Sequence, residues 1–413
     1  MQRRTFLQSL SATAITAAAG ALPAFAALPK MKITRVRVYL PPDASQLLYQ
    51  SDLVVTVETD AGITGIGEGG DVDMLRISAG RLIGRDPQNI ERLWQDLNRA
   101  YFYPAGRERT HSIGALDLAL WDLKGKVLGL PVNQILGGLV RDFCECYSGG
   151  GGLAGVTDKT PMKERARATM EAGFRAFRFG PGIVPGNSTY KTSEQVTLLR
   201  EAAAQVREGV GKDGDWAIDF HQRFELAEAV RGCNLIEEFA PFFVEDPVRA
   251  DAFLQDLPIL RTKVNVPIAA GEEWGNLWDF SALVEHHDID YVRATLPNVG
   301  GITEMMKVAA LCEKHFVGII PHFTGPIATA ALVNCLGTFS GPVLFEYAFG
   351  DRARLPHLPQ CFDFKSGKLY PNDRPGLGVE LDLKPLKLIA EITEPITARA
   401  QTYFRPDGSI TNW

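Results

Sequence analysis

The stretch from residue 217 to residue 272 contains three apolar runs that each end in an acid: Ala217-Ile218-Asp219, Phe243-Val244-Glu245 and Ala270-Gly271-Glu272. The acids are 26 and 27 residues apart, about the length of one strand followed by one helix. Because adjacent parallel strands of a closed barrel end at the same rim, we expect the three carboxylates to lie close together. Carboxylates so placed repel one another unless a cation neutralises them, and hard oxygen ligands suit Mg²⁺. Single acids at strand ends often cap the following helix, but three in register favour a metal site.

The sequence on both sides of this stretch alternates between short apolar segments and amphipathic ones. Helices are predicted, for example, from Thr160-Pro161 to Gly173 and from Thr192 to about Gly209. The alternation indicates an α/β fold with a closed parallel barrel, which we assign to residues 141–365. No Gly-x-Gly-x-x-Gly loop follows the first strand, which argues against dinucleotide binding. Eight strands are predicted, at 144–147, 176–179, 216–220, 242–245, 267–270, 291–295, 318–321 and 344–346.

The residues before the barrel have a different pattern. Alternating segments at 33–39, 53–58 and 64–68 predict an antiparallel sheet. Apolar residues at helical spacing follow at 90–97 and 113–128. Strands first and helices afterwards indicate a small α+β domain, which we assign to residues 27–140.

Composition excludes several classes of protein. The chain has 413 residues, of which 46% are hydrophobic and 22% charged, and its net charge is −6, as in an ordinary globular protein. No basic run suggests a nucleic-acid or anionic-membrane partner, and no segment is long and apolar enough to predict a membrane span. Cys144 and Cys146 lack redox or zinc spacing and the other four cysteines stand singly, so we predict buried free thiols.

Residues 1–26 predict an export signal. Arg3-Arg4 precedes an Ala-rich apolar stretch at 10–22, and Ala24-Phe25-Ala26 has the small-x-small pattern of a cleavage site. The pattern resembles a twin-arginine signal, which implies a periplasmic or exported protein. The alternative is an Ala-rich terminal helix.

Two histidines and a fourth acid are predicted at the rim that carries the three carboxylates. His221 lies two residues beyond Asp219 and points to the same side if the chain stays extended. His322 ends the seventh predicted strand, and Glu346 ends the eighth. A single histidine is more often structural, but two beside a predicted metal favour acid–base roles.

These residues together resemble the enolase superfamily, and within it the mandelate racemase-like members. The likeness covers nearly all of the chain after residue 26 and includes the motifs Ala-Leu-Trp-Asp-Leu-Lys-Gly-Lys at 119–126, Gly-Leu-Pro at 129–131 and Gly-Gly at 137–138. The resemblance implies a modified (β/α)₇β TIM-like barrel with an N-terminal capping domain that residues 366–413 complete. It also implies a homo-oligomer in which Asp219, Glu245 and Glu272 bind Mg²⁺.

Departures from the racemase pattern narrow the expected reaction. The second strand carries Arg178 where racemases have a Lys-x-Lys pair, so one of the two bases that racemisation needs is missing. The sixth strand reads Arg293-Ala294-Thr295 and lacks the Asp that would orient His322. Mannonate dehydratase-type members share both departures and also have a Tyr twelve residues after the first Arg, here Tyr190.

The resemblance to that subgroup implies an acid-sugar dehydratase that acts on an aldonate. Tyr190, whose phenolate Arg178 would stabilise, would take the C2 proton. His221 would protonate the departing C3 hydroxyl, and the product would be a 2-keto-3-deoxy acid. We also assign Arg293 and Glu346 to the catalytic set.

Two other functions stay open at this point. A cycloisomerase or epimerase of a sugar acid would use His322 as its base. A non-catalytic exported binding protein would keep the metal site and bind a sugar acid without turnover.

Substrate choice is expected to come from the capping domain. The resemblance implies two loops, at 41–51 and 68–76, in which Tyr49 and Asp73 would meet substrate hydroxyls. On the barrel side, Arg249 and Trp274 are candidates for the pocket wall, and Gly149–Gly152 either approach the substrate or form a turn.

Overall fold

The computed structural model describes residues 28–42, 44, 51–100, 103, 105–157, 159–180, 189, 191–348, 355–396 and 402–411. The predicted export signal at 1–26, Tyr49 and Tyr190 lie outside these residues. The contacts reported below all lie within one packed unit, Met31–Trp413. No helix in the described part of the chain has both the length and the apolar character needed to cross a bilayer.

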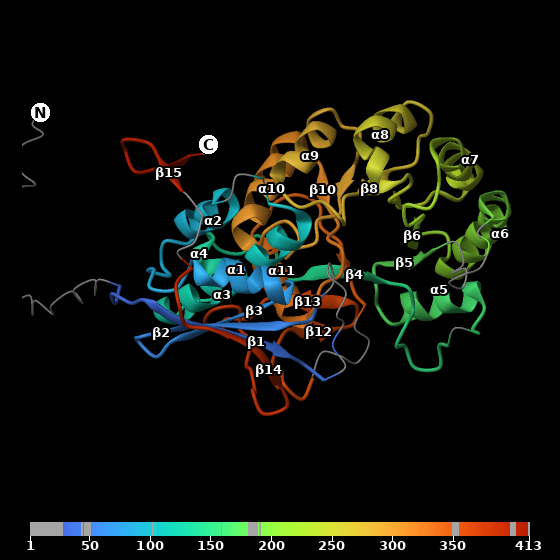
Figure 1. The fold of residues 1–413 in the computed structure, drawn as a ribbon. Coiled ribbons are helices and arrows are strands. Elements are labelled where there is room, and N and C mark those ends of the chain that lie inside the picture. The colour runs from blue at the N-terminus through green and yellow to red at the C-terminus, as the bar shows by residue number, and fades with distance from the viewer. Residues whose placement is uncertain are drawn as a thin grey trace, which may run out of the picture. The chain divides into compact units, whose positions relative to one another are not determined.

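The N-terminal domain is an antiparallel sheet covered by helices (Figure 1). Its strands β1 to β3 fall where alternation predicts them, and their neighbour is the late strand β14. Strand β3 lies directly on helix α3, because a Cβ at Gly65 or Gly67 would stand about 2 Å from the helix backbone. The elements are β1 (Ile33–Leu40), β2 (Val54–Thr59), β3 (Thr64–Glu68), α1 (Val72–Gly80), α2 (Ile90–Arg99), α3 (Arg107–Leu128), α4 (Val132–Ile135) and β14 (Lys387–Ile392).

Two features of this domain correct the sequence-based expectations. Helix α3 begins at Arg107, six residues before the predicted start at Ile113. The predicted loop at 68–76 contains the start of α1, whose first turn is capped by Asp71, a side chain that accepts hydrogen bonds from the N–H groups of Asp73 and Met74.

Eight parallel strands close into a barrel. Seven of them pair in chain order from β4 to β10, and β11 pairs with β4. A parallel bridge between Ile319 and Val343 completes the circle. The strands are β4 (Cys144–Ser148), β5 (Ala176–Phe179), β6 (Asp215–Asp219), β7 (Phe243–Glu245), β8 (Ile268–Ala270), β9 (Tyr291–Val292), β10 (Gly318–Ile319) and β11 (Phe345–Glu346).

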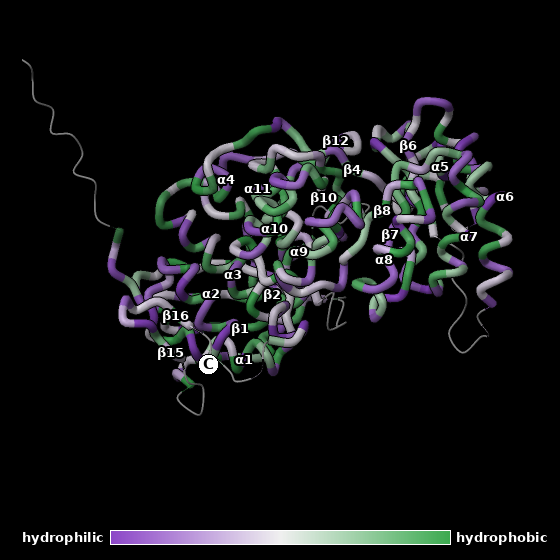
Figure 2. Tube along the Cα trace, turned by 90° about the horizontal axis from the view of Figure 1, so that it is seen from above, coloured by the Kyte–Doolittle hydropathy of each residue, from purple (hydrophilic) through white to green (hydrophobic). Residues whose placement is uncertain are grey.

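Helices follow the barrel strands and cover them. Their tubes alternate between hydrophilic and hydrophobic stretches, as Figure 2 shows for α5, α6 and α7. They are α5 (Met162–Glu171), α6 (Thr192–Val210), α7 (Leu226–Ile236), α8 (Phe253–Arg261), α9 (Leu277–Glu285), α10 (Ile302–His315) and α11 (Pro326–Leu336), with 3₁₀ turns η1 (Glu237–Phe239) and η2 (Ala250–Ala252). The predicted (β/α)₇β barrel with an N-terminal capping domain is therefore confirmed.

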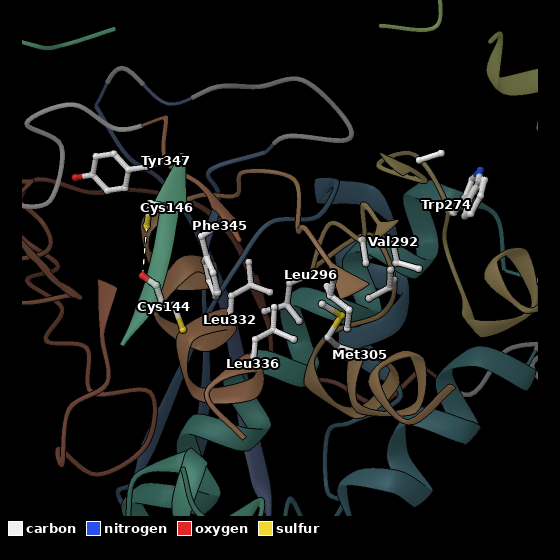
Figure 3. Close-up of a cluster of buried hydrophobic side chains, with 14 of the residues drawn as sticks. Cys144, Cys146, Trp274, Val292, Leu296, Met305, Leu332, Leu336, Phe345 and Tyr347 are labelled. Atoms are coloured by element: carbon white, nitrogen blue, oxygen red, sulfur yellow. Dashed lines mark hydrogen bonds between the residues drawn. The ribbon is translucent and has the colours of Figure 1, made fainter. Parts of the chain in front are cut away.

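The largest core cluster fills the space between strands and helices. Figure 3 shows part of it, with Cys144 and Cys146 on β4, Leu332 and Leu336 on α11, and Phe345 on β11. All six cysteines are buried and free, as their spacing predicts.

The residues after β11 add strands to both domains. The hairpin β12 (Asp363–Lys365) and β13 (Lys368–Tyr370) extends the sheet beside β4, so the proposed boundary at 365/366 falls within its turn. Strand β14 then joins the N-terminal sheet beside β1, and β15 (Tyr403–Phe404) and β16 (Ile410–Thr411) form a separate hairpin.

Two buried acids of the capping domain close the first turns of two barrel helices. Asp117 on α3 accepts the N–H of Thr303 in α10 at 3.0 Å, and Glu68 on β3 accepts the N–H of Ala328 in α11 at 2.9 Å. Neither helix has a capping side chain of its own, because each begins after a glycine. A Cβ at Gly301 or Gly325 would come within 2.5 Å or 2.3 Å of these carboxylates. The capping domain is thereby fixed to the helices that follow strands β9 and β10.

Candidate active site

The barrel strands bring the predicted metal ligands to one rim. Asp219 and Glu245 are direct partners in the pairing of β6 with β7. Glu272 lies two residues beyond the end of β8. All three side chains are nearly or fully buried, with exposed fractions of 11%, 0% and 11%. Their convergence follows from parallel strands of similar length that end at one side of the barrel.

Two guanidinium groups link these carboxylates. Arg178 on β5 donates to Asp219 Oδ2 at 2.6 Å and to Glu346 Oε1 at 2.5 Å. Arg293, which follows β9 directly, donates through Nη2 to Glu245 Oε1 at 2.5 Å and Glu346 Oε2 at 2.8 Å. The same Nη2 lies 3.5 Å from Glu272 Oε2. The predicted catalytic residues Arg178, Arg293 and Glu346 therefore lie in one buried network with the predicted ligands.

The network contains more carboxyl groups than guanidinium groups. Asp246, which is fully buried and follows Glu245 directly, brings the number of acids at this site to five. Burial raises the pKa of the Glu245 and Asp246 carboxyls well above their usual range. Burial also acts on Glu346, but the charges of Arg178 and Arg293 outweigh it and hold the pKa of Glu346 well below its usual value. Two guanidinium groups are too few to hold all five carboxyls in the ionised form.

The donor set fits Mg²⁺ in chemistry and in charge. Carboxylate oxygens are its preferred ligands, and a divalent cation would stabilise the ionised form of these buried carboxyls. Among the described residues, no three acidic, histidine or cysteine side chains already converge as a ready-made metal centre. The guanidinium groups of Arg178 and Arg293 contact the predicted ligands instead. Asp219, Glu245 and Glu272 are the residues that would hold the ion.

Glu272 lies between the two predicted acid–base histidines. His221 Nε2 is 4.0 Å from Glu272 Oε1, and His322 Nε2 is 3.6 Å from Glu272 Oε2. The side chain of His221 is 56% exposed, whereas that of His322 is 8% exposed. Burial lowers the pKa of His322, so its imidazole is neutral at pH 7 and able to accept a proton.

His221 reaches this position by a route that differs from the expected one. The chain does not stay extended beyond Asp219, because His221 and Gln222 have φ angles of 52° and 58°. Asp219 Oδ1 accepts the N–H of His221 at 2.6 Å, and Asp246 accepts hydrogen bonds from the Gln222 side chain and from the N–H of Gly271. Asp246 therefore ties the turn that carries His221 to the segment that carries Glu272. The sequence signal that could have identified Asp246 is its position directly after the predicted ligand Glu245.

A cavity of about 370 Å³ opens above Glu272 and the two histidines. Asp219 and Glu245 are not among its lining residues. Sequence reasoning missed the contribution of α3, because residues 107–112 are polar and show no apolar periodicity. The cavity is lined by Arg107, Glu108, His111, His221, Gln222, Glu272, Glu273, Thr295, Asn298 and His322.

Several predicted pocket residues lie elsewhere. Trp274 is buried between Phe253 and Phe280 in the core, and Arg249 pairs at the surface with Glu225. Asp73 is exposed on α1 and is not among the residues lining the cavity. Gly149–Gly152 form part of a turn, in which Gly149 accepts a hydrogen bond from Arg165.

The profiles of two protein families match this chain. Residues 44–137 match the N-terminal domain of mandelate racemase / muconate lactonizing enzyme. Residues 161–385 match the family described as enolase C-terminal domain-like. The first range falls on the capping domain and the second on the barrel.

Individual relatives match over most of their length. D-galactonate dehydratase of Xanthomonas euvesicatoria pv. vesicatoria (strain 85-10) is 35% identical over 402 residues, which cover 93% of this chain and 100% of that one. An enolase from Pantoea ananatis with bound D-gluconate and Mg superposes with a TM-score of 0.76 at 26% identity, over 86% of this chain and 94% of that one. L-Talarate dehydratase from Polaromonas sp. JS666, complexed with Mg and L-glucarate, superposes with a TM-score of 0.71 at 27% identity, over 87% and 98%.

Proposed function

This chain belongs to the mandelate racemase and muconate lactonizing enzyme family of the enolase superfamily, and from that premise we propose that it is a Mg²⁺-dependent dehydratase of aldonic acids. Its broad class is that of the superfamily's dehydratases, the hydro-lyases. The finer proposal concerns the substrate, the metal and the residues that move protons.

The observation that carries the proposal is the position of Glu272 between two imidazoles at the edge of the cavity. Elimination of water from a hydroxy acid needs a base for the proton beside the carboxylate and an acid for the departing hydroxyl. His322 is buried and neutral, which suits a base. His221 is near the other carboxylate oxygen of Glu272 and is more exposed. That exposure suits an acid that exchanges its proton with solvent.

The proposed reaction breaks two bonds and releases water. His322 takes the C2 proton, and the electron pair of the C2–H bond forms a C2–C3 double bond. The C3–O bond breaks as His221 donates a proton to the leaving oxygen, which departs as water. The resulting enol accepts a proton at C3 and loses the proton of its C2 hydroxyl, which gives a 2-keto-3-deoxy acid.

The main obstacle to this proton transfer is the additional negative charge that develops on the substrate carboxylate when C2 loses its proton. Bound Mg²⁺ would supply electrostatic stabilisation of the negative charge that develops there. Arg293 and Arg178 keep Glu245 and Glu346 in place around that position through the contacts described above. Glu346 also accepts the N–H of Phe323 at 3.1 Å, which fixes the backbone next to His322.

The role of Tyr190 as the base stays a prediction. The twelve-residue spacing after Arg178 favours it, and His322 is the base that the described geometry supports. Deuterium exchange at C2 in variants of the two residues distinguishes these bases.

Incubation of the purified protein with Mg²⁺ and a panel of aldonates tests the proposal. D-Galactonate and D-gluconate come first, because they are named for a relative and for a structural neighbour. We expect a 2-keto-3-deoxy acid, detected as its semicarbazone. Solvent deuterium exchange at C2 without keto-acid formation would indicate an epimerase instead, and no turnover of any sugar acid would exclude the dehydratase.

We also propose, from Arg3-Arg4 and the apolar stretch after it, that the protein is exported by the twin-arginine route. Replacement of both arginines by lysine is expected to leave the protein in the cytoplasm on cell fractionation. An unchanged distribution would contradict the proposal.

A further inference from the structure

One wall of the cavity comes from the first turn of α3. Arg107, Glu108 and His111 line it, whereas the expected residue Asp73 does not. The same cavity is lined by Glu272 and the two histidines. A substrate whose reacting carboxylate lies by Glu272 therefore shares the cavity with these side chains of α3.

An ion pair joins this wall to the barrel. Arg107 Nη1 lies 2.9 Å from Glu273 Oε2, and Glu273 follows the predicted ligand Glu272 directly. The stem of Arg107 passes beside Gly275, where a Cβ would stand 3.8 Å from Arg107 Cγ. Because the two side chains are 54% and 39% exposed, the pair adds little to stability. Its consequence is electrostatic, since the only guanidinium among the described lining residues is already paired with a carboxylate.

The remaining acid on the wall is not paired. Glu108 lines this cavity and also a neighbouring hollow, and in the described part of the chain its carboxylate makes no ion pair. Arg107, Glu108 and Glu273 together carry one positive and two negative charges. This wall is therefore rich in hydrogen-bond acceptors, and its net charge is negative.

We propose that Glu108 and Glu273 make the site selective for monocarboxylic sugar acids and reject diacids. This inference rests on the proposed function and names its substrate class. A terminal hydroxyl group donates hydrogen bonds to either carboxylate, whereas a second substrate carboxylate meets like charge and finds Arg107 engaged by Glu273. Specificity of this kind arises from repulsion of the wrong ligand as much as from attraction of the right one.

The test compares each aldonate with the C6 diacid of the same stereochemistry, with Mg²⁺ present. For the wild type we expect kcat/KM for the monoacid to exceed that for the diacid by about tenfold or more. Glu273→Gln and Glu108→Gln are each expected to shift that ratio towards the diacid by about tenfold, mainly through KM. Glu285→Gln, which removes an exposed acid at the end of α9, is the control and should leave the ratio unchanged.

Two further measurements keep the inference independent of variant folding and of turnover. Discrimination by the wild type should weaken as salt is raised, because salt screens exposed charges. Calorimetric binding of the two acids should show the same preference in the absence of chemistry. Equal use or equal binding of monoacid and diacid by the wild type, or an unchanged ratio in both Gln variants, would overturn the inference. A protein that binds monoacids selectively but converts none would instead overturn the proposed dehydration.

Discussion

The carboxylate of Glu272 faces a different imidazole through each of its oxygens, and this arrangement separates the two proton transfers. We expect His322→Asn to abolish both deuterium exchange at C2 and keto-acid formation. His221→Asn is expected to lower kcat for dehydration by about 10²-fold or more while exchange persists, because it removes only the acid. Proton NMR of an aldonate incubated in D₂O measures both. Tyr190→Phe is the companion variant, and loss of exchange in Tyr190→Phe with exchange retained in His322→Asn would assign the base to Tyr190.

Arg293 has a structural role that a surface arginine does not have. It is fully buried and contacts three carboxylates, so Arg293→Met leaves charged groups without a partner. We expect the free energy of unfolding to fall by about 3–5 kcal/mol, measured by chemical denaturation. Arg200→Met is the control, because Arg200 and its partner Glu238 are both more than half exposed, and it should change stability by less than about 1 kcal/mol. Equal effects of the two substitutions would show that the buried network adds no stability.

The residues of the site could be predicted from the sequence, but most of the contacts between them could not. Acids at strand ends and histidines nearby follow from strand spacing, because adjacent parallel strands share a rim. Spacing carries no information on which groups pair, so the contacts of Arg178 and Arg293 with the predicted ligands emerged only from the structure. The spacing of Asp219 and His221 also does not reveal the turn between them. There, two consecutive residues have positive φ and the chain is not extended.

At the scale of elements, the capping helix α3 combines two functions. Its first turn lines the cavity with Arg107, Glu108 and His111, and its middle carries Asp117 into the first turn of α10. The start of α3 could not be predicted from apolar periodicity, because Thr110, His111 and Ser112 are polar residues that become buried. Contacts between domains, rather than the period of a single helix, fix that burial.

The acid on α3 makes stability depend on pH in a definite direction. Burial raises the pKa of the Asp117 carboxyl from 3.8 to about 7. The folded protein therefore holds a proton that the unfolded chain has released, and the associated stability is present below about pH 4 and lost as pH rises through about 7. A shift of about three pKa units corresponds to about 4 kcal/mol.

Asp117→Asn should flatten this dependence. Denaturant unfolding at several pH values between 4 and 7 is expected to show a steeper decline in the free energy of unfolding for the wild type than for the variant. Asn can still accept the N–H of Thr303, so the helix start is preserved. Parallel declines in the two proteins would mean that Asp117 does not titrate in this range.

The close contact at Asp117 depends on a glycine. Gly301 has a φ of 88°, and an added Cβ would lie 2.5 Å from Asp117 Oδ2. Gly301→Ala is therefore expected to destabilise the protein by more than about 1 kcal/mol, through both backbone strain and displacement of a buried carboxylate. Gly84→Ala is a matched control, because Gly84 has a φ of 80° but open space around it. Thermal unfolding of both variants separates the packing effect from the backbone effect, and equal losses would contradict a packing role for Asp117.

For the whole molecule, the order of strands and helices could be predicted from the sequence. The pairing of the C-terminal strands could be predicted only in part. Alternation of apolar and amphipathic segments located all eight barrel strands, although β9 is limited to Tyr291–Val292 where 291–295 was expected. An apolar run in the sequence predicts a strand over its whole length. The actual strand ends where the neighbouring strands stop offering hydrogen bonds. The hairpin that joins β4 involves pairing over more than 200 residues of sequence, for which a single sequence carries no signal.

Metal binding should couple the rim to the stability of the whole chain. An ion held by the folded state alone stabilises it by about 2.7 kcal/mol at a concentration of 100 times its Kd. We expect Mg²⁺ to raise the midpoint of thermal unfolding and EDTA to reverse the rise, with NaCl at equal ionic strength as the control. Glu245→Gln should lose the response, because it removes one of the three predicted carboxylate ligands. Since bound Mg²⁺ stabilises the ionised carboxylates that hold it, an equal response in Glu245→Gln would place the ion elsewhere, and no response in the wild type would remove the metal from the proposed mechanism.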